Sequence, residues 1–456
     1  MFVHRIWAVV VLLLLPGEGW TEDLTEPQAR SEVLSSPVAL RPRSRWAYLL
    51  RLEATALALI PKQGTEEGEG FVQLEPMVVL DGGETFGLNL GAPVRLRLWG
   101  GGKGDPLVRK EDWDTLSDWG QLIRLLNLGS DASPVSLWAG SLDSYSLLSG
   151  HLVRRYSNRG NPDDHPAGAV LTGSVGPLYT EAFVSDVLGA RLAGAEVEVD
   201  VQHVLSGRPE EPGRYTLALS AVHDWARAGG AARPVTLAHV DGTAVVGVRR
   251  GQDSGFEAEV FAGWGGRPGD GGAWGAVAGV GADAVSPTLD LQARLEVRRQ
   301  QGGFRQGYFG PDYELARFRV AGNSGVPLAE DAFPKGYSAF GEVIVAWDAV
   351  YLGDLVQRHL RCSVSAEAFT WGRVDADMRL TAQLFRRNVE VAFRGLAVGM
   401  RQPGARYLTS GEVRWRFLGG KLFALGQGGT LLYPEAEGGL RPGAFASVGM
   451  GVDNVR

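Results

Sequence analysis

The chain has 456 residues, of which 64 are glycine and one is cysteine, and its formal net charge is −7. The single cysteine, Cys362, excludes an intrachain disulfide framework and any metal site built from several cysteines. The charge is mild and mixed in sign, which argues against a nucleic-acid partner. The glycines follow no G-X-Y period and lie between short alternating segments, as turn glycines do.

The first twenty residues have the pattern of an export signal. Arg5 gives a charged start, residues 6–16 are apolar, and small glycines follow in the sequence GEGW. The apolar run is shorter than the roughly 20 residues that a transmembrane helix needs. We therefore expect a secretory signal peptide over residues 1–20, with an uncleaved anchor as the alternative.

The rest of the chain is dominated by a period of two. In residues 289–298, leucine, alanine and valine alternate with aspartate, glutamine, arginine and glutamate. Successive side chains of a strand face opposite sides, so this pattern predicts a strand with one apolar and one charged face. The same alternation recurs in residues 93–99, 195–202, 256–260, 374–384, 389–394 and 412–417.

One stretch breaks this period. In residues 114–129, Leu116, Trp119, Ile123 and Leu126 are spaced three or four apart. Asp114 or Ser117 can cap the start of a helix, and Gly129 can end it. The pattern predicts one short amphipathic helix over residues 114–128.

The number of strands and the placement of aromatic residues favour a membrane barrel over a soluble sheet. We count about 16 to 20 candidate strands, many near the ~10-residue length of a membrane-spanning strand. An open sheet rarely exceeds ~10 strands, whereas closure into a barrel accommodates more. Aromatic residues near the ends of alternating segments suit the two membrane interfaces: Trp99, Trp138, Trp264, Trp371 and Tyr407. We predict an all-β fold, a transmembrane antiparallel β-barrel of about 16–18 strands.

These features together resemble Gram-negative outer-membrane β-barrels of the porin-like class, over residues 45 to about 451. The arginine-rich, lysine-poor composition is similar in style to uncharacterised myxobacterial outer-membrane proteins. The resemblance implies a signal peptide (1–20), an N-terminal periplasmic lead (21–44) and one barrel domain (45–456) in the lipid bilayer of the cell outer membrane. It also implies passage of a solute, and some barrels of this kind export secreted polysaccharide.

Charged strand faces are the candidate functional residues. An arginine facing lipid at the midplane costs roughly 2–4 kcal/mol, so charges should face the lumen. A lumen lined by both signs is hydrated and orients polar solutes. The predicted lumen-lining residues are Arg294, Glu296, Arg298, Asp375, Asp377, Arg379, Glu412, Arg414 and Arg416.

The expected function is passage of a hydrophilic solute or polymer, including secreted polysaccharide, selected by size and charge. We expect the 114–128 helix to narrow the lumen, or alternatively to pack over the barrel mouth or meet an envelope protein partner. Three other functions stay open: a non-conducting scaffold or adhesin, a barrel hydrolase, and a soluble exported carbohydrate-binding protein. We expect no enzyme activity, no cofactor, no metal and no nucleic acid.

Two further stretches could carry chemistry. Within residues 144–168, His151, Asp163, Asp164 and His165 could bind an ion, or a serine could pair with His151. The sequence NPDDHPAG is typical of a loop, so we interpret the stretch as a strand end followed by a rim loop. The aromatic residues of 304–318 are interpreted as an interfacial girdle and loop anchor, with stacking on a sugar as the alternative.

Overall fold

The computed structural model describes residues 47–61, 68–83, 85–100, 104–130, 133–189, 191–207, 213–225, 234–269, 272–318, 320–321, 326–327, 334–350, 357–385, 388–434 and 440–453. The predicted signal peptide and periplasmic lead lie outside the described residues. Within the described ranges, no helix is both long enough and apolar enough to cross a bilayer.

The described chain is mostly strand. The strands are β1 (Ala47–Pro61), β2 (Glu69–Asp81), β3 (Phe86–Gly91), β4 (Val94–Trp99), β5 (Ile123–Leu128), β6 (Val135–Gly140), β7 (Gly168–Val175), β8 (Leu178–Val184), β9 (Leu192–Asp200), β10 (Tyr215–Asp224), β11 (Val235–Arg250), β12 (Gly255–Gly266), β13 (Trp274–Val285), β14 (Leu289–Gln301), β15 (Val320–Ala321), β16 (Val326–Pro327), β17 (Gly336–Val350), β18 (Gln357–Phe369), β19 (Val374–Leu384), β20 (Val389–Met400), β21 (Arg406–Phe417), β22 (Leu422–Pro434) and β23 (Leu440–Asp453). The helices are η2 (Lys110–Asp112), η3 (Ser117–Leu122), α2 (Val201–Ser206) and α3 (Tyr313–Phe318).

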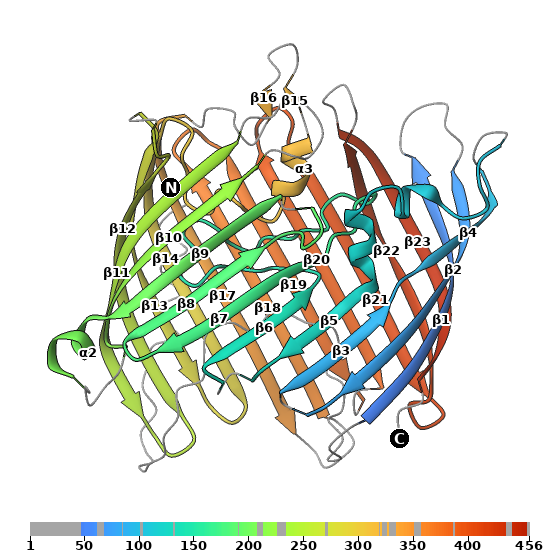
Figure 1. Ribbon diagram of the computed structural model, residues 1–456, viewed down its shortest axis with the longest axis horizontal. Coiled ribbons are helices and arrows are strands. Elements are labelled where there is room, and N and C mark those ends of the chain that lie inside the picture. The colour runs from blue at the N-terminus through green and yellow to red at the C-terminus, as the bar shows by residue number, and fades with distance from the viewer. Residues whose placement is uncertain are drawn as a thin grey trace.

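The main sheet closes on itself. Its strands pair antiparallel in chain order, except that β3 and β4 both pair with β2, and β1 also pairs with β23. Figure 1 shows the blue first strand beside the red last strands. This closure confirms the predicted all-β antiparallel barrel.

The barrel has 20 strands rather than the predicted 16–18. The sheet contains 21 segments, but β3 and β4 pair with successive parts of β2 and form one interrupted strand. The interruption falls at Pro93, which has no N–H to donate to a neighbouring strand. The count was low because β3, β5 and β6 have only 6 residues each, too few for a period of two to stand out.

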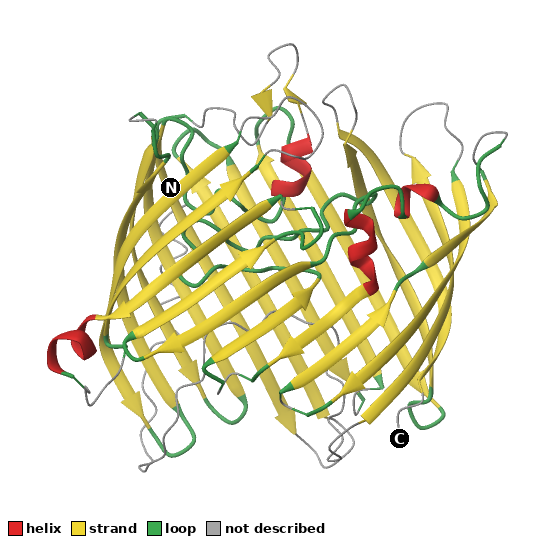
Figure 2. Ribbon diagram, viewed as in Figure 1, coloured by secondary structure: helices red, strands yellow, loops and turns green. Residues whose placement is uncertain are grey.

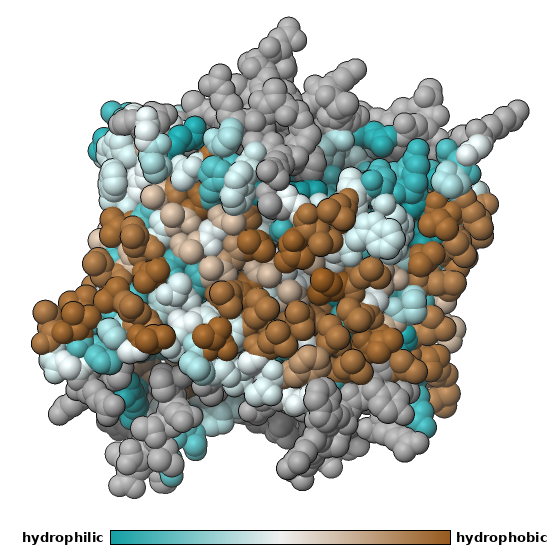
Figure 3. All heavy atoms as spheres, viewed as in Figure 1, coloured by the Kyte–Doolittle hydropathy of each residue, from teal (hydrophilic) through white to brown (hydrophobic). Residues whose placement is uncertain are grey.

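The two faces of the barrel wall differ as the alternation predicts. In β14, Val297 is 63% exposed and its neighbour Arg298 is 1% exposed. Figure 3 shows apolar side chains forming a band around the middle of the visible outer surface, with hydrophilic ones towards the two ends. A closed barrel leaves no unpaired edge in lipid, and an apolar band matches the hydrocarbon core. The protein is a transmembrane β-barrel of the outer membrane.

The predicted aromatic positions divide between the two faces. Trp99, Trp264 and Tyr407 are exposed on the barrel, as an interfacial girdle requires. Trp138 is instead partly buried and packs against a cluster of apolar side chains inside the barrel. A tryptophan near a strand end therefore does not by itself identify the lipid-facing surface.

The predicted helix over residues 114–128 is wrong. Residues 117–122 form the 3-10 helix η3, and residues 123–128 form β5, which pairs with β3 and β6. A spacing of three or four residues also arises from a 3-10 turn followed by a strand. Of the residues expected to narrow the lumen, Ile123 and Leu126 lie in the wall as part of β5, and Leu116 and Trp119 are exposed at and within η3.

Candidate functional site

Two segments between strands fold into the barrel. The first inward segment is residues 141–167, between β6 and β7, and the second is residues 302–318, after β14. Figure 2 shows these loops, in green, crossing the interior between the strands. Tyr145, Tyr156, Phe304 and Phe309 in these segments are buried. The rim-loop interpretation of residues 144–168 and the girdle interpretation of 304–318 are therefore wrong.

The two inward segments are hydrogen-bonded to each other. Val153 and Phe309 form a parallel bridge. The Arg154 N–H donates to the Phe309 carbonyl at 3.1 Å, and the Gly307 N–H donates to the His151 carbonyl at 2.7 Å. These bonds satisfy backbone groups that have no strand partner inside the barrel.

An apolar cluster holds both segments against one side of the barrel. It contains Leu152, Tyr156 and Phe309 from the inward segments, packed with Phe183 of β8 and Leu237 of β11. Phe309 and Tyr313 meet edge to face, with ring centroids 4.8 Å apart. Apolar residues on the inner face of this side are unusual for a water-filled barrel, and they explain why the segments stay inside.

Arg154 and Arg155, which we call the arginine clamp, connect the first inward segment to the opposite wall. Arg154 donates to Glu296 at 2.9 Å and to Glu342 at 3.0 Å. Arg155 donates to Glu342 at 3.1 Å and also to Asp377. The backbone of Arg155 has a φ of 52°, a left-handed conformation that is unfavourable for a residue with a side chain. The contacts of the clamp therefore hold this residue in place.

The three predicted residues of β14 lie on the inner face behind the inward segments. Glu296 accepts hydrogen bonds from Arg154, Arg294 and Arg298. Arg298 also reaches Glu367 at 2.8 Å. Glu296 and Arg298 are buried, Arg294 is partly buried, and their charges are paired. These residues therefore support the fold of the interior more directly than they line an open lumen.

The six predicted residues of β19 and β21 also lie on the inner face. Asp377, Arg379 and Arg414 are buried, and the other three are partly exposed. Asp375 pairs with Arg373, Asp377 with Arg155, and Arg379 with Asp143. Glu412 and Glu53 both contact Arg414, and Arg416 lies near Glu390. The first inward segment touches β19 through the clamp and Asp143, and β21 faces the remaining space.

Partial exposure of inner-face charges locates the hydrated part of the lumen. The side chain of Glu412 is 39% exposed and that of Arg394 is 30% exposed, although both lie near the middle of their strands. On the first inward segment, Asp143 faces the same space and is 41% exposed. Mid-strand residues lie far from both barrel mouths, so their exposure indicates water inside the barrel. The open space is thus off-centre, between the first inward segment and β20–β21.

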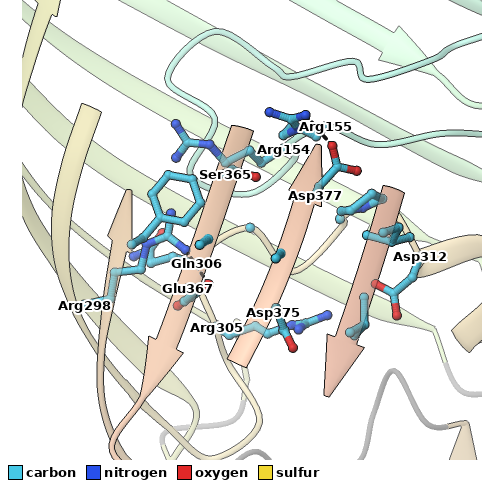
Figure 4. Close-up of a pocket in the computed structure, with 18 residues that line it drawn as sticks. Arg154, Arg155, Arg298, Arg305, Gln306, Asp312, Ser365, Glu367, Asp375 and Asp377 are labelled. Atoms are coloured by element: carbon cyan, nitrogen blue, oxygen red, sulfur yellow. Dashed lines mark hydrogen bonds and ion pairs between the residues drawn. The ribbon is translucent and has the colours of Figure 1, made fainter. Parts of the chain in front are cut away.

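A cavity lies where the inward segments meet β17–β20. It has about 560 Å³ of empty space, part of which is open to solvent. Figure 4 shows Arg154 and Arg155 at the top of it, Arg298 at the left, and Arg305 with Asp375 at the bottom. Both signs of charge face this cavity, which suits polar solutes that carry charge.

The four residues that the sequence suggests as a possible ion site, His151, Asp163, Asp164 and His165, do not form one cluster. Asp163 pairs with Arg109, Asp164 pairs with Arg191, and His165 lies 3.4 Å from Asp112. These pairs fasten the end of the first inward segment near η2 and β9. His151 instead lies deep in the interior, near His239 and Asp241 of β11. Of the nearby serines, Ser146 accepts through its hydroxyl oxygen from the Arg155 N–H, and the buried hydroxyl of Ser149 has no hydrogen-bond partner among the described residues.

Glu342, Asp143 and the arginine clamp were missed from the sequence. Glu342 is the one charge within residues 336–347, an otherwise uncharged stretch, and its partners are 187 and 188 residues away. Five apolar residues precede the clamp within residues 144–153, spread among serine, glycine and histidine: Tyr145, Leu147, Leu148, Leu152 and Val153. This apolar content was the available signal that the segment turns inward.

No protein-family model and no curated protein matches the chain. Among solved structures, a BenF-like porin from Pseudomonas fluorescens Pf-5 is similar over 90% of this chain and 98% of that one, with 10% identity and a TM-score of 0.37. Pseudomonas aeruginosa OccK2 (OpdF) covers the same shares with 13% identity and a TM-score of 0.35. Acinetobacter baumannii OccAB3 is similar over 90% of this chain and 98% of its own, with 8% identity and a TM-score of 0.35.

Proposed function

We propose that the protein lets small hydrophilic solutes cross the outer membrane through the off-centre space between the first inward segment and β20–β21. The observation that carries this proposal is the exposure of Glu412, Arg394 and Asp143 deep inside a closed barrel. A barrel of this many strands is wide enough to hold an aqueous channel. The inward segments fill part of the barrel and confine the channel to one side of it.

The charges along this space would select solutes by size and sign. Arg394 and Arg379 hold Asp143 between them at 3.2 and 2.7 Å, and Arg416 and Glu390 lie beyond. Positive and negative groups at close spacing stabilise a polar solute without trapping it, which conduction requires. A small solute fits this arrangement better than a polysaccharide, because an extended polymer would require the inward segments to move aside.

Planar-bilayer recording of the purified protein tests the proposal. We expect discrete current steps of small size, because only part of the lumen is open. Protein that is folded, as shown by its altered gel migration without heating, and that carries no current after its vesicles fuse with the bilayer would contradict the proposal.

A non-conducting barrel that supports an envelope complex is the second candidate. The apolar cluster and the buried arginine clamp favour it, because both stabilise the inward segments within the lumen. The same recording separates the two candidates, since this one predicts inserted protein without current.

Reversing the charge of Arg394 should change ion selectivity. In Arg394→Glu, the new carboxylate and that of Asp143 would both face the space. We therefore expect the reversal potential in a salt gradient to shift towards cation selectivity. The Arg394→Lys variant keeps the charge and should behave like the unmodified protein. An unchanged reversal potential in Arg394→Glu would place the ion path elsewhere.

A further inference from the structure

Three metal-ligating side chains meet inside the barrel at a point that the proposed function does not use. His151 comes from the first inward segment, and His239 and Asp241 come from β11, where their separation by two residues puts both on the inner face. All three are buried, and their ligating atoms lie within 4.8 Å of one another. Nδ1 of His239 is 3.2 Å from Oδ1 of Asp241, and Nε2 of His151 is 4.0 Å from the same oxygen.

The neighbouring strand leaves room for this cluster. Gly265 of β12 lies directly across from His239, and Gly263 lies across from Asp241. A Cβ on Gly263 would be 2.4 Å from Cε1 of His239, and a Cβ on Gly265 would be 2.7 Å from its Cδ2. Only glycine at both positions lets the His239 ring lie against this part of the wall.

The hydrogen bonds around His239 suggest that something is bound between it and Asp241. Nε2 of His239 is 3.2 Å from the amide nitrogen of Gln306, and the buried amide oxygen of Gln306 has no hydrogen-bond partner among the described residues. Heavy-atom positions do not distinguish the oxygen of this amide from its nitrogen, so the amide can equally be placed rotated by half a turn. In that orientation its oxygen accepts a hydrogen bond from Nε2–H of His239. Nδ1 of His239 then carries a lone pair facing the Asp241 carboxylate at 3.2 Å, and a cation between the two would stabilise both.

We propose that His151, His239 and Asp241 bind one divalent transition-metal ion of the zinc type, which links the first inward segment to the barrel wall. Two imidazoles and a carboxylate are a common donor set for such ions, with bonds of roughly 2.0–2.2 Å. Ligands held this way lie a little over 3 Å apart, so the His239–Asp241 pair already fits and His151 needs to approach slightly. Gln306, from the second inward segment, is the outer partner that fixes the His239 tautomer.

The surroundings of His151 are compatible with this role. Its Nδ1 has no hydrogen-bond partner among the described residues, and Nε2 is 3.4 Å from the guanidinium of Arg294. Arg294 is itself paired with Glu296, which offsets its repulsion of a cation.

Cobalt binding by the full-length folded protein tests the inference. Protein in detergent is stripped with a chelator and titrated with Co²⁺, and we expect a single bound ion with the visible absorption of a nitrogen–oxygen site, displaced by Zn²⁺. The His239→Ala and Asp241→Asn variants should lose this signal. The His223→Ala variant should keep it, because His223 lies on neighbouring β10 and bonds to Thr236 instead.

His151→Ala covers the case in which a wall variant fails to fold. His151 is outside the strands, so this variant should keep the altered gel migration of the folded barrel and still lose the cobalt signal. Absence of bound Co²⁺ in the stripped protein would overturn the inference, as would equal binding in the folded His151→Ala variant. The result does not depend on whether the barrel conducts, because binding is measured without a membrane current.

Discussion

The double variant Arg154→Ala/Arg155→Ala is expected to raise the single-channel conductance several-fold. The change removes the ion-pair partners of Glu342, which are Arg154 and Arg155, and also the closest partner of Asp377. Breaking a buried ion pair by removing one partner costs about 3–5 kcal/mol, because a buried charge is left uncompensated. Water would enter to solvate these carboxylates, and the first inward segment would no longer be held across the lumen.

A lysine pair at the same positions is the matched control. Arg154→Lys/Arg155→Lys keeps both positive charges next to Glu296 and Glu342, so we expect a conductance close to that of the unmodified protein. Both variants should still show the gel migration of a folded barrel, since the strand pairing is untouched. An unchanged conductance in a folded double alanine variant would show that the clamp does not hold the segment in place.

The variant Leu295→Arg is expected to destabilise the barrel by about 2–4 kcal/mol, the cost of an arginine that faces lipid at the midplane. Leu295 is the central residue of β14 and is exposed, whereas its neighbours Arg294 and Glu296 point inward. The measurement is reversible urea unfolding of the protein in lipid vesicles.

Leu289→Arg provides the comparison on the same strand and the same face. Leu289 is the first residue of β14, where an arginine can reach the interface, so we expect a cost of about 0–1 kcal/mol. Equal destabilisation by the two variants would contradict the placement of β14 across the bilayer.

The barrel wall could be predicted because alternation is a local property. In β19 each inward charge is followed by an outward apolar residue, and β14 follows the same rule except at Arg298, which precedes Arg299. The two faces can therefore be assigned without knowing the neighbouring strands. The start of β14 at Leu289 and both ends of β19, Val374 and Leu384, agree with the alternating segments in the sequence. The number of strands was harder to predict, because short strands such as β5 have too few residues for an alternation of side chains to be recognised.

The inward segments could not be predicted in the same way. Their shape depends on contacts such as Arg155 with Asp377, which are separated by 222 residues in the sequence. Local features were misleading, since the turn residues around Asp163 are typical of a surface loop while Asp163 pairs with Arg109 of a distant segment. The proposed metal ligands could not be predicted from local sequence either, because His151 and His239 come together only when the first inward segment folds into the barrel.

Chemical labelling from water tests most directly that an aqueous passage runs beside β21. In a Cys362→Ala background, Glu412→Cys introduces a thiol in the proposed passage, and Ser220→Cys introduces one on the buried inner face of β10. A membrane-impermeant thiol reagent, added during bilayer recording, should label Glu412→Cys and reduce its current while leaving Ser220→Cys unchanged. Labelling of Ser220→Cys with no reaction at Glu412→Cys would contradict the off-centre passage and would place the water on the other side of the inward segments.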